Sequence, residues 1–321
     1  MAKRKRIKIK SVNLKWWIFP LITALMISIP KVYSSLDLKW MTGSKFTPFV
    51  YESVALPVPV SDFTKPPINP NHIFIIDRTS KTILWDKGSK NRVYPASTTK
   101  MMTALIAMEA FDLDTVITVS RSYSEGQVVG FKPFDKLTVD QLLYALLIQS
   151  GNDAAEILAE NYIGGRTAFI EAMNKKALEL GLKNTHFTNP SGLDEYGHYS
   201  TALDLAHLAD VAMNKSEFAK IVGLENAVIT TEDNQNYIVK NVNQLLGKVP
   251  GVLGVKTGYT VGAGQSLVTL VNRDGHEVII SLLGSLDRFS DTQKIIDWVY
   301  GNFTWVDSSQ YIQELQPEPK L

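Results

Sequence analysis

The sequence contains no cysteine among its 321 residues. This absence excludes a disulfide scaffold, a zinc site built on thiolates, an iron–sulfur cluster and a cysteine nucleophile. Hydrophobic residues make up 45% of the chain and charged residues 20%. That balance is typical of a folded globular protein and excludes a mainly disordered chain. The length allows one large domain or two of ordinary size.

Acidic residues are missing from the first 34 positions, although the formal net charge of the whole chain is only +1. These positions hold eight basic residues, so residues 35–321 carry 25 basic and 32 acidic side chains, a net charge of −7. The small net charge is therefore the sum of a basic tail and an acidic body. The eight basic residues are Lys3, Arg4, Lys5, Arg6, Lys8, Lys10, Lys15 and Lys31.

Within the tail, residues 16–29 form a run of 14 residues without charge, after seven basic residues. A positive end followed by an apolar stretch is typical of an export segment. Fourteen residues are short for a membrane span and suit a signal peptide cleaved near Ser34. Alternatively, the segment remains uncleaved and anchors the protein in the membrane. Its two tryptophans would then lie at the membrane interface, and the span would extend to Tyr33 because the side chain of Lys31 can reach the polar surface.

Both alternatives predict an extracytoplasmic protein, and the second predicts membrane attachment through residues 1–34. A basic nucleic-acid-binding arm at residues 3–10 is disfavoured because an apolar run follows it. We therefore expect no nucleic-acid partner.

Residues 35–70 show few regular patterns and contain six prolines, which is typical of an extended linker. The predicted folded domain covers residues 71–303, and a polar tail covers 304–321. The six prolines are Pro48, Pro57, Pro59, Pro66, Pro67 and Pro70.

The folded part alternates between strand-like and helix-like patterns, with strands at both ends and helices between them. This order predicts an α/β (α+β) domain in which an antiparallel sheet is flanked by helices and carries a mostly helical insertion. The expected strands are 73–77, 82–85, 228–231, 237–239, 266–271 and 278–283, and Val255 indicates one more. The expected helices are 100–110, 139–149, 154–162, 168–180, 202–213 and 292–300.

The start of the helix predicted over 100–110 carries a candidate nucleophile and base. Pro95 marks the helix start, so Ser97 and Lys100 lie in its first turn and share a face. A serine needs a base to act as a nucleophile, and a lysine serves as one when burial or nearby positive charge lowers its pKa. The pattern alone is ambiguous, because Ser28 and Lys31 repeat it in the export segment.

Two further short motifs contain polar residues suited to a binding cleft. Ser150 and Asn152 lie in a tight turn between two predicted helices. Lys256 and Thr257 can bind a carboxylate at a strand end, where Gly258 permits close approach of the backbone to a ligand. Each motif alone also fits an ordinary turn or strand end.

Together, the three motifs occur in the order and contexts of the active-site serine penicillin-recognising enzymes. The chain resembles low-molecular-mass penicillin-binding proteins, the serine D-alanyl-D-alanine carboxypeptidases of the DacF type in peptidase family S11. The resemblance covers about residues 70–303 and implies a β-lactamase/DD-peptidase-like fold. It also includes the stretches 142–155, 173–194, 199–205, 241–246 and 258–264.

The resemblance implies a role for each motif residue. Ser97 would attack the carbonyl of the penultimate D-Ala, Lys100 would accept its proton, and Ser150 would relay a proton to the leaving D-Ala or to Lys100. Asn152 would hold the substrate amide. Lys256 and Thr257, with Gly258 beside them, would bind the terminal carboxylate, and the backbone N–H groups of Ser97 and Tyr259 would form the oxyanion hole.

The implied activity is removal of the terminal D-Ala from peptidoglycan stem peptides through an acyl-enzyme, with inhibition by β-lactams. A D,D-endopeptidase that cleaves cross-links needs the same residues and remains an alternative. A non-catalytic penicillin-binding sensor is less favoured because all the catalytic residues are present. A β-lactamase is also disfavoured, since Lys183 stands where a deacylating Glu-x-x-Leu-Asn element needs asparagine.

No metal ion is expected, because the five histidines form no HExxH-like pair. No cofactor is expected either. His186 and His198 lie near the resembling stretches but are interpreted as structural. Family members often carry a second β domain and a C-terminal amphipathic membrane helix. Only about 20 residues follow Tyr300 here, and they are polar. Membrane attachment is therefore assigned to the N-terminal segment.

Overall fold

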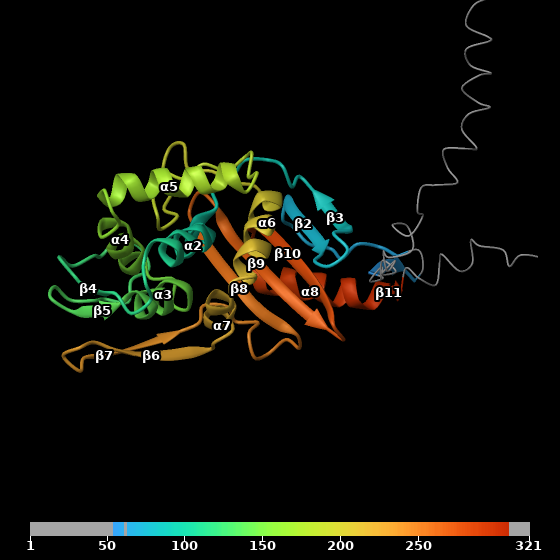
Figure 1. The fold of residues 1–321 in the computed structure, drawn as a ribbon. Coiled ribbons are helices and arrows are strands. Elements are labelled where there is room, and N and C mark those ends of the chain that lie inside the picture. Colours follow the sequence, from blue (N-terminus) through green and yellow to red (C-terminus); the bar gives the residue numbers. More distant parts are fainter. Residues whose placement is uncertain (1–53, 61–62, 308–321) are drawn as a thin grey trace, which may run out of the picture. The chain divides into compact units, whose positions relative to one another are not determined.

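A five-stranded antiparallel sheet forms the centre of the fold in this computed structural model, which describes residues 54–60 and 63–307 (Figure 1). Its strand order is β3-β2-β10-β9-β8. The predicted antiparallel sheet is thereby confirmed. The strands are β2 (His72–Asp77), β3 (Ile83–Lys87), β8 (Val252–Thr260), β9 (Gly264–Arg273) and β10 (His276–Ser285).

Both faces of this sheet are buried, which follows from apolar residues at successive positions. Ile73 and Ile75 of β2 pack into a cluster with Ile295 and Val299 of helix α8 (Arg288–Asn302). Phe74 lies between them in sequence and packs into the larger cluster of the helical region. Since successive side chains of a strand point to opposite faces, one apolar strand serves two cores.

The helices of the second core all lie between β3 and β8 in sequence, as the predicted helical insertion requires. Two small hairpins accompany them. The helices are α2 (Lys100–Ala110), α3 (Val139–Leu147), α4 (Asn152–Glu160), α5 (Gly165–Glu179), α6 (Ala202–Met213) and α7 (Ser216–Val222). The hairpins are β4 (Val116–Thr118) with β5 (Lys136–Thr138), and β6 (Asn226–Thr230) with β7 (Asn236–Lys240).

Side-chain caps fix where several helices begin. Thr138 and Gln141 form a reciprocal capping box at the start of α3. Thr201 accepts a hydrogen bond from the backbone of Asp204 at the start of α6, and Asp287 caps α8 in the same way. The cap at Asp287 begins α8 beside the end of the sheet, which places the first residue of this helix near β8.

A two-stranded sheet joins segments that the sequence predicts to be a linker and a domain end. Strand β1 (Ala55–Pro59) pairs antiparallel with β11 (Phe303–Asp307). Trp305 of β11 donates a hydrogen bond from Nε1 to Asp77 at 2.7 Å and stacks on His276. Part of the predicted linker 35–70 and the start of the predicted tail are therefore paired with the folded body.

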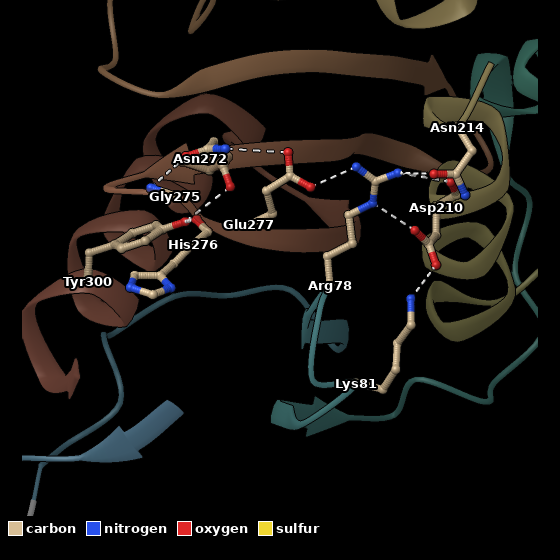
Figure 2. Close-up of polar contacts among 10 residues, drawn as sticks. Arg78, Lys81, Asp210, Asn214, Asn272, Gly275, His276, Glu277 and Tyr300 are labelled. Atoms are coloured by element: carbon tan, nitrogen blue, oxygen red, sulfur yellow. Dashed lines mark hydrogen bonds and ion pairs between the residues drawn. The ribbon is translucent and has the colours of Figure 1, made fainter. Parts of the chain in front are cut away.

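One arginine links three elements at the edge of the domain. Figure 2 shows Arg78, after β2, donating to Asp210 of α6 at 2.8 Å and to Glu277 of β10 at 2.7 Å. Lys81 also contacts Asp210, at 2.6 Å. Burial alone would raise the pKa of Asp210, but the hydrogen bonds from Arg78 and Lys81 lower it. The network fastens α6 to the sheet away from the predicted catalytic motifs.

The predicted export segment at residues 1–34 lies outside the described residues, as do most of the linker and of the C-terminal tail. In residues 54–60 and 63–307, none of the helices combines the length and the apolar character needed to cross a membrane.

Candidate active site

The candidate nucleophile and base meet at the start of α2. Ser97 lies in a 3₁₀ turn over Ala96–Thr99 that leads directly into the helix, and the Nζ of Lys100 lies 3.0 Å from the Oγ of Ser97. Ala96 has a φ of 50°, a conformation that residues other than glycine rarely adopt. Backbone strain next to a candidate nucleophile is common at functional sites.

Lys100 is fully buried and lies among oxygen atoms. Its Nζ contacts Oδ1 of Asn152 and the carbonyl of Ser191, each at 2.6 Å, in addition to Ser97. Burial and the positive charge of Lys256 hold the pKa of Lys100 well below its usual value. The amine therefore loses its proton far more easily than a lysine in water.

The turn between α3 and α4 brings Ser150 and Asn152 into the same site. Ser150 has a φ of 64°, so the chain reverses sharply there, and its Oγ accepts a hydrogen bond from Nζ of Lys256 at 2.9 Å. The Nδ2 of Asn152 donates to the carbonyl of Glu125 at 2.9 Å. Ser150 thus contacts Lys256, whereas Asn152 contacts Lys100.

Strand β8 supplies the third motif. Lys256 and Thr257 are buried, with 2% and 4% of their surfaces exposed. Burial, together with the charge of Arg288, lowers the pKa of Lys256 to about 7. Lys256 therefore loses its proton far more easily than a lysine in water. A negatively charged ligand beside it would raise this pKa and favour the ammonium form.

Gly258 brings β8 against the backbone of the nucleophile. A Cβ at this position would lie 3.0 Å from the Cβ of Ala96 and 3.2 Å from the backbone nitrogen of Ser97. From the sequence, this glycine was expected to allow approach to a ligand. In the structure it allows approach to the turn that carries Ser97. Tyr259 follows and is 63% exposed at the cleft.

These residues border a cleft with a volume of about 660 Å³. Ser97, Ser150, Thr257 and Tyr259 line it, and so does Arg288. Arg288 donates from Nη1 to the carbonyl of Gly258 at 2.7 Å. Its Nε is buried and has no hydrogen-bond partner in the described part of the chain. The cleft is thus lined by a hydroxyl nucleophile, by Thr257 and by the guanidinium side chain of Arg288.

All eight residues predicted from the three motifs lie around this cleft or contact residues that do. The sequence interpretation omitted Arg288, the carbonyl of Ser191 and Asp153. The buried carboxylate of Asp153 accepts hydrogen bonds from the backbone of Val129 and Gly130 and holds that loop against α4. Asp153 directly precedes the helix predicted over 154–162, so an acidic residue at a helix start was the available signal.

His198 is buried next to Thr99 and links two segments of the chain through its ring nitrogens. Its Nδ1 accepts a hydrogen bond from the backbone of Thr188 at 3.0 Å, so the proton lies on Nε2, which donates to Oγ1 of Thr99 at 2.9 Å. Burial lowers the pKa of His198 to about 4. Among the described residues, no three histidine or acidic side chains are grouped so that they could hold a metal ion.

Comparison with known proteins identifies the family of the chain. The profile of the D-alanyl-D-alanine carboxypeptidase family, peptidase S11, matches residues 60–286. The D-alanyl-D-alanine carboxypeptidase DacF of Bacillus subtilis is 36% identical over 239 residues, which are 71% of this chain and 61% of DacF. The D-alanyl-D-alanine carboxypeptidase of Streptomyces sp. strain K15 is 36% identical over 263 residues, which are 75% of this chain and 90% of that protein.

A solved structure shows the same fold. The crystal structure of the Streptomyces K15 DD-transpeptidase aligns with a TM-score of 0.71 at 33% identity, and the alignment covers 74% of this chain and all of that one. The family match covers more than half of the chain, and the fold agrees with it. The chain therefore belongs to the D-alanyl-D-alanine carboxypeptidase family, peptidase S11.

Proposed function

We propose that the protein is a serine D-alanyl-D-alanine carboxypeptidase that removes the terminal D-Ala from peptidoglycan stem peptides. The observation that carries this proposal is the contact between Ser97 and Lys100. A buried amine with a strongly lowered pKa lies 3.0 Å from a hydroxyl that faces an open cleft. Such a pair can generate an alkoxide nucleophile without a histidine.

The hydrogen bonds around Lys100 support its role as the base. A neutral amine has two hydrogens and one lone pair. The carbonyl oxygens of Asn152 and Ser191 accept both hydrogens at 2.6 Å. The lone pair is then directed at Ser97 and can take the hydroxyl proton as Oγ attacks the peptide carbonyl. The N–H groups of Ser97 and Tyr259 are proposed to stabilise the oxyanion.

Two cationic side chains and one hydroxyl on one side of the cleft are proposed to recognise the free C-terminus of the substrate. Lys256, Thr257 and Arg288 can each donate hydrogen bonds to its carboxylate. Arg288 lines the same cleft as Thr257, which supports this role. Ser150 accepts from Lys256, so its own hydrogen remains available for the nitrogen of the leaving D-Ala. Lys256 can then reprotonate Ser150, and on hydrolysis Lys100 returns its proton to Ser97 while Lys256 regains one from the attacking water through Ser150.

The remaining amide hydrogen of Asn152 is proposed to hold the carbonyl of the substrate residue before the scissile bond. Water then hydrolyses the acyl-enzyme and restores Ser97. β-Lactams mimic the acyl donor and are proposed to acylate the same serine. The proposed location is extracytoplasmic, with residues 1–34 as an anchor or a cleaved signal and a catalytic domain over 71–303.

The experiment that tests the activity compares two substrates. We expect the protein to release D-Ala from a diacyl-Lys-D-Ala-D-Ala peptide, and prior treatment with benzylpenicillin should abolish that release. Hydrolysis of a cross-linked dimer of stem peptides should be slower. Cleavage of the dimer without release of D-Ala from the monomer would contradict the proposal and favour a D,D-endopeptidase.

A further inference from the structure

A second pocket, with a volume of about 330 Å³, lies next to the residues that surround Lys100. Asn152 and Ser191 line it, and both accept a hydrogen bond from Nζ of Lys100. Neither Ser150, Thr257 nor Arg288 lines it, whereas all three line the main cleft. The two cavities share no lining residue, but each is lined by groups that contact Lys100, namely Ser97 in the main cleft and Asn152 and Ser191 in the second pocket.

The direction of the substrate follows from the proposed chemistry. The leaving D-Ala extends from Ser97 toward Thr257 and Arg288, which receive its carboxylate. The part of the peptide before the scissile bond must then extend the other way, past Asn152. The second pocket therefore lies where the side chain preceding D-Ala-D-Ala is expected.

The walls of this pocket carry both signs of charge. Two guanidinium groups, from Arg121 and Arg166, and two carboxylates, from Glu125 and Glu156, line it. Arg166 holds Glu156 through Nε at 2.7 Å and Nη2 at 3.3 Å, and its Nη1 has no partner among the described residues. Arg166 therefore keeps one donor group for a ligand, although its charge is already paired with that of Glu156.

Glu125 supplies the complementary group. Its carboxylate makes no hydrogen bond or ion pair within residues 54–60 and 63–307, while its backbone carbonyl accepts from Nδ2 of Asn152 at 2.9 Å. That bond fixes Glu125 beside the residue proposed to hold the substrate backbone. The unpaired carboxylate of Glu125 and the guanidinium of Arg166 thus line the same pocket, in which two positive and two negative side chains balance.

We infer that this pocket binds the side chain of the substrate residue that precedes D-Ala-D-Ala and favours one that ends in both an ammonium and a carboxylate. The ammonium contacts Glu125, and the carboxylate contacts Arg166. A lysine side chain satisfies only Glu125, and a neutral side chain satisfies neither group. The inference rests on the proposed carboxypeptidase function, since that function sets the direction of the peptide.

The test uses three peptides of the form Nα-acetyl-X-D-Ala-D-Ala. X is meso-2,6-diaminopimelate, with both charges, L-lysine, with the ammonium alone, or Nε-acetyl-L-lysine, with neither. We expect kcat/KM for D-Ala release to be about tenfold higher for the first peptide than for the second, and higher for the second than for the third. The ratio of kcat/KM between two peptides is used because a change that affects acylation of all three peptides equally does not alter it.

Two variants test which protein side chain recognises each charge of the substrate side chain. Arg166→Gln should reduce the ratio of diaminopimelate to lysine peptide to about one. Glu125→Gln should remove the advantage of the lysine peptide over its acetylated form. Lys176→Gln is the matched control, because Lys176 lies on the same helix and pairs with Glu109 at 2.7 Å, outside both cavities. It should leave every ratio unchanged.

Equal kcat/KM for the three peptides, with normal penicillin labelling, would overturn this inference and leave the proposed function standing. Ratios that stay unchanged in both Arg166→Gln and Glu125→Gln would also overturn it, and would make the ion pairs purely structural. Failure to cleave any peptide, together with absence of penicillin labelling, would overturn the proposed function and this inference together.

Discussion

Replacement of Lys100 by alanine should lower the rate constant for acylation by benzylpenicillin by about 10³-fold to 10⁴-fold. The expected loss is that of a general base in contact with its nucleophile. In the wild-type protein, Nζ of Lys100 lies 3.0 Å from Oγ of Ser97, and burial holds the pKa of Lys100 well below its usual value. The measurement is the time course of labelling with a fluorescent penicillin.

The control for folding is the thermal unfolding midpoint, compared with that of Lys176→Ala, which removes a lysine outside both cavities. Normal labelling by a folded Lys100→Ala protein would exclude Lys100 as the base. The pH profile gives an independent check, because only the neutral amine accepts a proton. In the wild type, the acylation rate should fall as the pH decreases through the lowered pKa of Lys100.

Replacement of Lys256 by alanine should act mainly on substrates with a free C-terminal carboxylate. A hydrogen bond from a charged group contributes about 2 kcal/mol, which corresponds to about 30-fold in kcat/KM. The comparison uses the same peptide with a C-terminal carboxylate and with a C-terminal amide. The ratio of the two values of kcat/KM should fall about 30-fold in the variant, whereas changes at Ser150 affect both peptides alike.

Lys256→Ala should also change the pH profile. The charge of Lys256 contributes to the lowered pKa of Lys100, so its removal should raise that pKa and move the acidic limb of the profile to higher pH. In the wild type, Lys256 loses its proton as the pH rises through about 7, which should weaken carboxylate binding there. An unchanged ratio of acid to amide peptide would exclude Lys256 from carboxylate recognition.

Hydrophobic periodicity predicted the longer elements well. The helices predicted over 100–110 and 202–213 coincide with α2 and α6. Strands β4 and β5 have three residues each, too short for an alternating pattern, and were not predicted. Strand β1 contains two prolines and pairs with β11 at the far end of the domain. Local sequence contains no information about such a distant partner.

The motifs predicted the members of the site better than their contacts. First-turn spacing was enough to place Lys100 against Ser97. The contact between Ser150 and Lys256 joins residues 106 positions apart and depends on how the helical insertion folds onto β8. Arg288 was missed because it lies in no motif. The cap at Asp287 and the fold of the sheet bring it to the cleft.

Ser97 is the residue proposed to form the acyl-enzyme. Mass spectrometry of the protein after incubation with benzylpenicillin, followed by peptide mapping, tests this directly. We predict a single adduct with the mass of one penicillin molecule, on the peptide that contains Ser97. An adduct on a different residue, or its persistence in a folded Ser97→Ala protein, would exclude Ser97 as the nucleophile.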